Sequence, residues 1–168
     1  AIKEAGVETL VQLLWKGNAD GKEHAALTLA QLARRAAAGV DIAKVGGISA
    51  FVSWLEDPER GPPELAARAL SEIAVDSPDM QSQIAEEGAI APLCEMVRAW
   101  SVASSKARHT ASATVAAGAL ATLAREHVPN QMMISEEDVR RLTPHTAHPS
   151  PLIPLPSMPS SPLANPSP

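Results

Sequence analysis

Three stretches of the sequence align with one another: EHAALTLAQLA at residues 23–33, ELAARALSEIA at 64–74 and TVAAGALATLA at 114–124. The second begins 41 residues after the first, and the third begins 50 residues after the second, which is one period plus about nine inserted residues. The apolar positions follow one another at steps of four, three and one, so they lie along one side of a helix. They are Ala25, Ala66 and Ala116; Leu29, Leu70 and Leu120; Leu32, Ile73 and Leu123; and Ala33, Ala74 and Ala124. The sequence therefore predicts three copies of one amphipathic helix.

A second set of stretches precedes these copies: AGVETLVQLL at 5–14, GGISAFVSWL at 46–55 and GAIAPLCEMV at 88–97. Their apolar residues also correspond at helical offsets, as Val7, Ile48 and Ile90; Leu10, Phe51 and Leu93; Val11, Val52 and Cys94; and Leu14, Leu55 and Val97. We expect a shorter helix before each of them, because Ser77 stands as a capping residue in front of Pro78 and Val128-Pro129-Asn130 partly repeats this pattern. The unit is therefore predicted to be three helices in about 41 residues.

The join between the first two helices of the unit has a sequence of its own. Ile42-Ala-Lys-Val-Gly-Gly-Ile48 and Ile84-Ala-Glu-Glu-Gly-Ala-Ile90 share it, and Ile134-Ser-Glu-Glu-Asp-Val139 begins a further copy in which Asp138 replaces the Gly. An Ile, a short acidic stretch, a small pair with Gly and an apolar helix are the pattern of armadillo repeats, which these units resemble. The resemblance covers residues 1 to about 142.

The resemblance implies an all-α fold, a right-handed α-solenoid of about three armadillo repeats with a partial fourth. The units are expected at about 1–38, 39–79, 80–129 and 130–142. Two-helix HEAT repeats are the nearest competing interpretation. Repeat arrays need neighbouring repeats and polar caps at both ends. Because the first copy starts abruptly and the fourth fades after Leu142, we expect a piece of a longer array.

Composition narrows the class of protein. Ala occupies 31 of 168 positions and aromatic residues make up 2%, which suits close-packed helices better than a β-sandwich. A net charge of −5 argues against nucleic acid as a partner. A lone Cys94 excludes an internal disulfide and indicates a reducing compartment, so we expect the cytoplasm or the nucleus. No apolar run reaches the roughly 18 residues of a membrane helix, so membrane insertion is not expected.

The composition changes at Thr143. Residues 143–168 hold 9 of the 15 Pro and no Asp, Glu, Lys or Arg, so we expect a disordered Pro/Ser-rich tail. Within it, Pro151-Leu-Ile-Pro154 has the spacing of ligands for SH3-type grooves, although the flanking basic residue of such ligands is missing. A plain tail without a partner is the alternative interpretation.

The third helix of each unit offers a candidate surface for binding. At 100° per residue, Leu27 and Gln31 lie about 160° from Leu29 on either side, opposite the buried stripe. The equivalent residues are Arg68 and Glu72 in the second copy and Gly118 and Thr122 in the third. In peptide-binding members of the family this row carries Asn with Trp one turn earlier, and none of these residues carries over. The absence of the aromatic slots argues against binding of nuclear-localisation peptides.

The inserted residues lie between Arg98 and Ser112. Insertions in repeat arrays map to surface loops, so we expect a loop there, with Lys106 and Arg108 as further candidates for partner contact. A flexible loop without a partner is the plainer interpretation.

No catalytic or metal-binding constellation is apparent, and we expect neither a catalytic residue nor a cofactor. Cys94 falls on the apolar face of its helix, and His145 and His148 stand in the Pro-rich tail without further ligands. The acidic groups Glu86-Glu87 and Glu136-Glu137-Asp138 recur at the same point of the repeat, which indicates a structural role. The expected function is that of a non-catalytic scaffold or adaptor that binds a protein or an extended peptide, with no small-molecule substrate. The substrate-recognition part of a larger U-box ubiquitin ligase and a self-associating structural array are the alternatives.

Overall fold

The computed structural model describes residues 2–34, 38–102 and 106–142. Within these ranges the chain is all-helical and has no strand, as predicted. The helices are α1 (Ile2–Lys16), α2 (Ala19–Ala33), α3 (Ala38–Lys44), α4 (Gly47–Glu56), α5 (Pro63–Ala74), α6 (Pro78–Glu86), α7 (Ile90–Val102), α8 (Lys106–Ala124) and α9 (Val128–Leu142).

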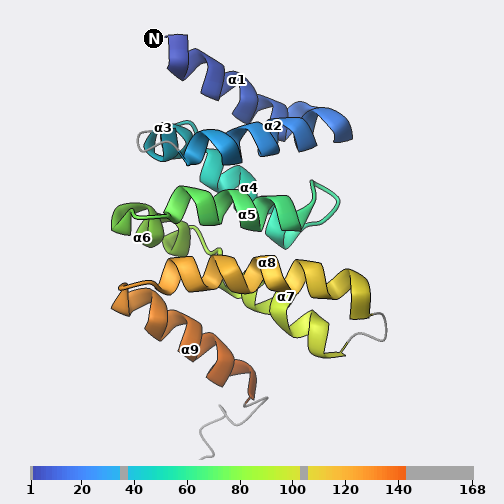
Figure 1. The fold of residues 1–168 in the computed structure, drawn as a ribbon, viewed down its shortest axis with the longest axis vertical. Coiled ribbons are helices and arrows are strands. Elements are labelled where there is room, and N and C mark those ends of the chain that lie inside the picture. Colours follow the sequence, from blue (N-terminus) through green and yellow to red (C-terminus); the bar gives the residue numbers. More distant parts are fainter. Residues whose placement is uncertain (1, 35–37, 103–105, 143–168) are drawn as a thin grey trace, which may run out of the picture.

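The helices are stacked along the long axis of the molecule (Figure 1). Helices α1 and α2 form one end, and α7, α8 and α9 form the other. The predicted Ala-rich copies are α2, α5 and α8, and contacts join α2 to α5 and α5 to α8. The preceding stretches form α1, α4 and α7, each packed against the Ala-rich helix that follows it. This helical, repeat-like arrangement fits an α-solenoid in general.

Burial follows the two apolar stripes that the sequence predicts. Ala25, Ala66 and Ala116 are buried, and so are Leu29 and Leu70, whereas Leu120 is half-buried. In the other set, Val11, Val52 and Cys94 are all buried. Cys94 therefore belongs to the core, as the alignment predicts. Phe51 and Trp54 of α4 add an edge-to-face ring contact with centroids 6.0 Å apart.

The join between the first two helices of a unit depends on a glycine. Gly46 and Gly88 have φ of 79° and 91°, a left-handed conformation that only Gly adopts without strain. They separate α3 from α4 and α6 from α7. Asp138 stands at the corresponding position of the last copy, and there α9 continues without a break to Leu142. The helix runs on because the residue that would allow the turn is absent.

The inserted residues do not form the long surface loop expected from the sequence. They lengthen two helices instead: α7 and α8 have 13 and 19 residues, against 10 and 12 in the equivalent α4 and α5. The insertion is rich in Ala, the residue with the highest intrinsic helix propensity, and contains neither Pro nor Gly between Arg98 and Ser112. Residues 103–105, between the two helices, lie outside the described residues.

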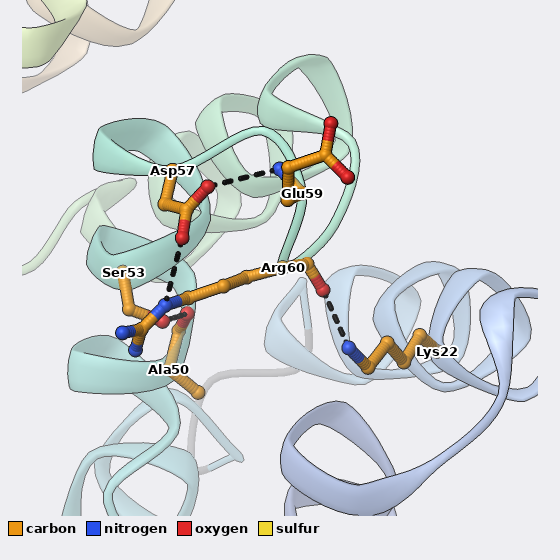
Figure 2. A network of polar contacts seen from close by, with 6 residues as sticks. All are labelled: Lys22, Ala50, Ser53, Asp57, Glu59 and Arg60. Atoms are coloured by element: carbon orange, nitrogen blue, oxygen red, sulfur yellow. Dashed lines mark hydrogen bonds and ion pairs between the residues drawn. The ribbon is translucent and has the colours of Figure 1, made fainter.

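The loop between α4 and α5 is held to α2 (Figure 2). Lys22 Nζ donates to the Arg60 carbonyl oxygen at 2.7 Å, and Arg60 Nε lies 3.2 Å from Asp57 Oδ2. Gly61 completes this loop against the ring of the buried Trp54, where a Cβ would overlap the indole. The loop therefore needs Gly61 for a close approach and not for a special backbone angle.

Ser77 occupies the N-cap position of α6 in front of Pro78, as predicted, but its side chain makes no capping hydrogen bond. The predicted tail, residues 143–168, and the SH3-type spacing within it lie outside the described residues. No single helix in the described ranges is long and apolar enough to cross a membrane.

Candidate functional site

The predicted row of third-helix residues lies on three helices that stand side by side, α2, α5 and α8. Gln31, Arg68 and Gly118 are exposed, whereas Leu27, Glu72 and Thr122 are half-buried. Leu27 and Gln31 of α2 and Arg68 and Glu72 of α5 line one small hollow of about 100 Å³. The structure therefore brings four of the predicted residues together across two neighbouring helices.

A larger hollow of about 440 Å³ lies beside the first one. It is bounded by the end of α2, the start of α3 and the turn between α5 and α6. Its wall combines charged and apolar side chains, and Val40 and Val75 there are 42% and 44% exposed. Arg34 and Glu72 line both hollows. Their side chains lie 3.7 Å apart (Arg34 Nε to Glu72 Oε2), so this ion pair separates the two spaces.

The charges near the ends of the third helices alternate. Arg34 and Arg125 occupy equivalent positions of the first and third copies, and both pair with acids of the second copy. Arg125 Nη1 lies 3.9 Å from Asp76 Oδ1, and the side chains of this pair are 66% and 82% exposed. An ion pair this open to water adds little stability to the fold.

In the third copy, the row residues Gly118 and Thr122 of α8 offer few groups that a partner could bind. Thr122 Oγ1 lies 3.0 Å from the Gly118 carbonyl oxygen and 3.1 Å from Ser71 Oγ of α5, so its hydroxyl is occupied within the fold. Gly118 has open space where a Cβ would stand. The row is therefore polar and hollowed between α2 and α5, and nearly featureless on α8.

Lys106 and Arg108 stand in the first turn of α8 and not in the expected loop. Their side chains lie outside the described residues, as does that of Trp100. The structure therefore does not place these candidates relative to the row.

One pair of side chains has the composition of a catalytic dyad. Ser82 Oγ lies 2.8 Å from His127 Nε2, but His127 Nδ1 accepts the backbone N–H of Asn130 at 3.3 Å. With Nδ1 as the acceptor, Nε2 carries the proton and donates it to Ser82. The imidazole cannot then accept the Ser82 proton, so the pair is a structural contact and not an activated nucleophile.

Three residues of the described region were not foreseen from the sequence. Arg34 lies at the end of α2, one residue beyond the aligned stretch 23–33. His127 is half-buried and caps α9. Asn130 is 1% exposed, and its Nδ2 donates to the carbonyl oxygens of Leu123 and Gln81 at 2.8 and 3.1 Å. The capping signature Ser77-Pro78 could have pointed to His127, because both residues precede a first helix of a unit.

No group of three or more His, Cys, Asp or Glu side chains within the described ranges could hold a metal ion. Among the recurring acidic residues, Glu87 at the end of α6 makes a structural contact, because its Oε2 accepts a hydrogen bond from Ser49 Oγ of α4 at 2.8 Å. Glu87 therefore helps to join one unit to the next.

No protein-family model matches the sequence, and the comparison with curated proteins found no relative. Among solved structures, the chain is similar to the crystal structure of an engineered protein at a TM-score of 0.67 and 27% identity, over 79% of this chain and 51% of that one. A second crystal structure of an engineered protein matches at a TM-score of 0.64 and 28% identity, over 85% of this chain and 34% of that one. The chain therefore spans about half the length of the first and a third of the second.

Proposed function

We propose that the chain is an armadillo-type α-solenoid that acts as a non-catalytic protein-binding scaffold. Its described helices are grouped as a second and a third helix (α1 and α2), two complete units of three (α3 to α5 and α6 to α8), and the first helix of a fourth unit (α9). The partner is an extended segment of another protein. It lies along the exposed side of the third helices, with its main contacts between α2 and α5.

The observation that carries this proposal is the pair of adjoining hollows between α2 and α5. Each solenoid unit places its third helix beside the next, and extended surfaces of this kind are what solenoids use for binding. Arg68 offers an exposed guanidinium, and Glu72 and Arg34 hold each other in a pair that a partner's charges can replace. A rigid stacked core limits the conformational entropy that the protein loses on binding.

The test is the selection of peptides from a random library displayed on phage, with residues 1–168 as the target. The selected peptides are then titrated against the variant Arg68→Ala/Glu72→Ala. If the row binds the peptide, the double substitution raises Kd by about tenfold or more, the equivalent of at least about 1.4 kcal/mol.

A matched control removes one positive and one negative charge elsewhere. Glu8→Ala/Lys16→Ala changes two exposed side chains of α1, and we expect its Kd to equal that of the unmodified chain. The helical circular dichroism of both variants should match that of the unmodified protein. Selection of no peptide, or equal affinity of the Arg68→Ala/Glu72→Ala variant, would refute the proposed binding face.

A further inference from the structure

The smaller of the two hollows between α2 and α5 carries one positive charge in excess. Three of the residues that line this space of about 100 Å³ are charged: Arg34, Arg68 and Glu72. Two guanidinium groups and one carboxylate leave a single positive charge, in a chain whose net charge is −5. The smaller hollow is therefore a local site whose sign is opposite to that of the molecule as a whole.

The excess charge belongs to Arg68. Glu72 stands one turn later on the same helix, but its carboxylate lies toward α2, where Oε2 is 3.7 Å from Arg34 Nε. Within the described residues, the exposed side chain of Arg68 makes neither an ion pair nor a hydrogen bond. Its guanidinium therefore keeps all five N–H donors for a partner.

The opposite wall of the smaller hollow also presents donors. The 3.7 Å between Arg34 and Glu72 is longer than a hydrogen bond, so this pair attracts by charge without using the N–H groups of Arg34. The Arg34 side chain is 67% exposed, and the exposed amide of Gln31 stands on the same helix. N–H donors from both α2 and α5 therefore line a space in which Glu72 is the only carboxylate.

A carboxylate from a partner matches this set of groups. Guanidinium and carboxylate are both planar forks and form two parallel N–H···O bonds. One carboxylate neutralises the single excess charge, whereas a phosphate would bring nearly two negative charges beside Glu72. We propose that the extended segment bound by this chain places the side chain of one Asp or Glu in the smaller hollow, between Arg34 and Arg68. This inference rests on the proposed function, since it names the chemistry of the partner at that same site.

The larger hollow, of about 440 Å³, does not share this preference. Arg34 and Glu72 line it too, but the third charged residue of its wall is Asp76. Arg125 lies 3.9 Å from Asp76 and is not part of the wall, so an acidic side chain finds no unpaired guanidinium there. The net charge of −5 also disfavours a partner with a run of acidic residues. The partner segment should therefore carry one acidic residue in a fixed register.

The test compares peptides selected from a random phage library on residues 1–168 and on the variant Arg68→Glu. Peptides selected on the unmodified chain should share one Asp or Glu, and its replacement by Asn or Gln should raise Kd about tenfold or more. Arg68→Glu makes the charge of the smaller hollow negative, so its peptides should carry Lys or Arg at that position. Because Arg68 is exposed and Glu is a good helix former, the variant should keep its helical circular dichroism.

An exchange of charges tests whether the two groups meet directly. When the acidic residue of a selected peptide is changed to Lys, the peptide should bind Arg68→Glu about tenfold more tightly than it binds the unmodified chain. Lys16→Glu is the matched control, since it makes the same change of charge on an exposed side chain of α1. It should leave the Kd of the acidic peptide unchanged.

The outcomes separate this inference from the proposed function. Peptides that lose affinity for Arg68→Ala/Glu72→Ala but need no acidic residue would overturn the inference and leave the proposed binding face in place. Selection of no peptide would refute both. Tighter binding of a phosphoserine than of Asp or Glu at the shared position, or an equal rise in Kd with Lys16→Glu, would also overturn the assignment of a carboxylate to this hollow.

Discussion

Gln81 and Gln131 make the same hydrogen bond in successive units. Gln81 Nε2 donates to the carbonyl oxygen of Ala74, and Gln131 Nε2 donates to that of Ala124, each seven residues earlier, at 3.3 and 2.8 Å. Both amides thus reach from a first helix back to the last carbonyl of the preceding third helix. In both units this last carbonyl also accepts the backbone N–H three residues later, that of Ser77 or His127, at 3.3 Å, so the glutamine amide is its second donor.

Asn130 provides the strongest test of this polar junction. Asn130→Ala leaves the buried carbonyl oxygens of Leu123 and Gln81 without the amide that now serves both. We expect the free energy of unfolding to fall by about 2–3 kcal/mol, because buried polar groups without partners are costly. Urea denaturation measures the change. Gln131→Ala removes an exposed amide and should lower the free energy of unfolding by about 1 kcal/mol or less. If Gln131→Ala destabilised the protein more than Asn130→Ala does, the role given to Asn130 would be contradicted.

His127 is predicted to act as the cap of α9. His127→Ala removes the acceptor for the Asn130 N–H and should lower stability by about 1 kcal/mol. His127→Ser restores a capping oxygen but cannot reach Ser82, so it should recover only part of that loss. Thermal unfolding of the unmodified protein, His127→Ser and His127→Ala should give melting temperatures that fall in this order. Equal melting temperatures for the Ala and Ser variants would show that the cap contributes nothing.

Two glycines should respond in opposite directions to the same substitution. Gly61→Ala places a methyl group inside the van der Waals envelope of Trp54 and should destabilise the fold by about 1–3 kcal/mol. Gly118→Ala adds the same group to an open position inside α8 and should stabilise it by up to about 1 kcal/mol. The denaturation midpoints of the two variants test this prediction. It fails if both substitutions shift the midpoint in the same direction.

Glu126 has a left-handed backbone with φ of 54° at the end of the third copy, and Asp76 has the equivalent conformation with φ of 53°. Glu126→Gly should raise the free energy of unfolding by up to about 1 kcal/mol, since Gly adopts this region without strain. Glu126→Ala serves as the control, because Ala keeps the strain. The free energies of unfolding are measured by chemical denaturation. A higher value for Glu126→Ala than for Glu126→Gly would contradict the idea that the left-handed backbone at Glu126 is strained.

The helical core could be predicted because it depends on the spacing of apolar residues along the sequence. Positions such as Ala25, Ala66 and Ala116 recur at a fixed period, and a period of helical steps determines which side of each helix is buried. Gly46 and Gly88 also recur at the same point of the aligned joins, and both have a positive φ.

The inserted segment and the polar junctions could not be predicted in the same way. An insertion has no counterpart in the other copies, so the alignment did not show that it lengthens α7 and α8. Asn130 stands where the preceding unit has the apolar Met80, and His127 stands where it has Ser77. The sequence alone does not show which partners such polar residues find. Those partners come from a different unit, about 45 to 49 residues away in sequence.

We propose that the chain binds an extended segment of another protein along α2 and α5. Backbone amide NMR spectra of the protein, recorded with and without a peptide selected from the library, test it most directly. We predict that the perturbed resonances are those of Leu27, Gln31, Arg34, Arg68 and Glu72 and of their neighbours. Perturbations confined to α1, α4 and α7, with these five residues unchanged, would contradict the account.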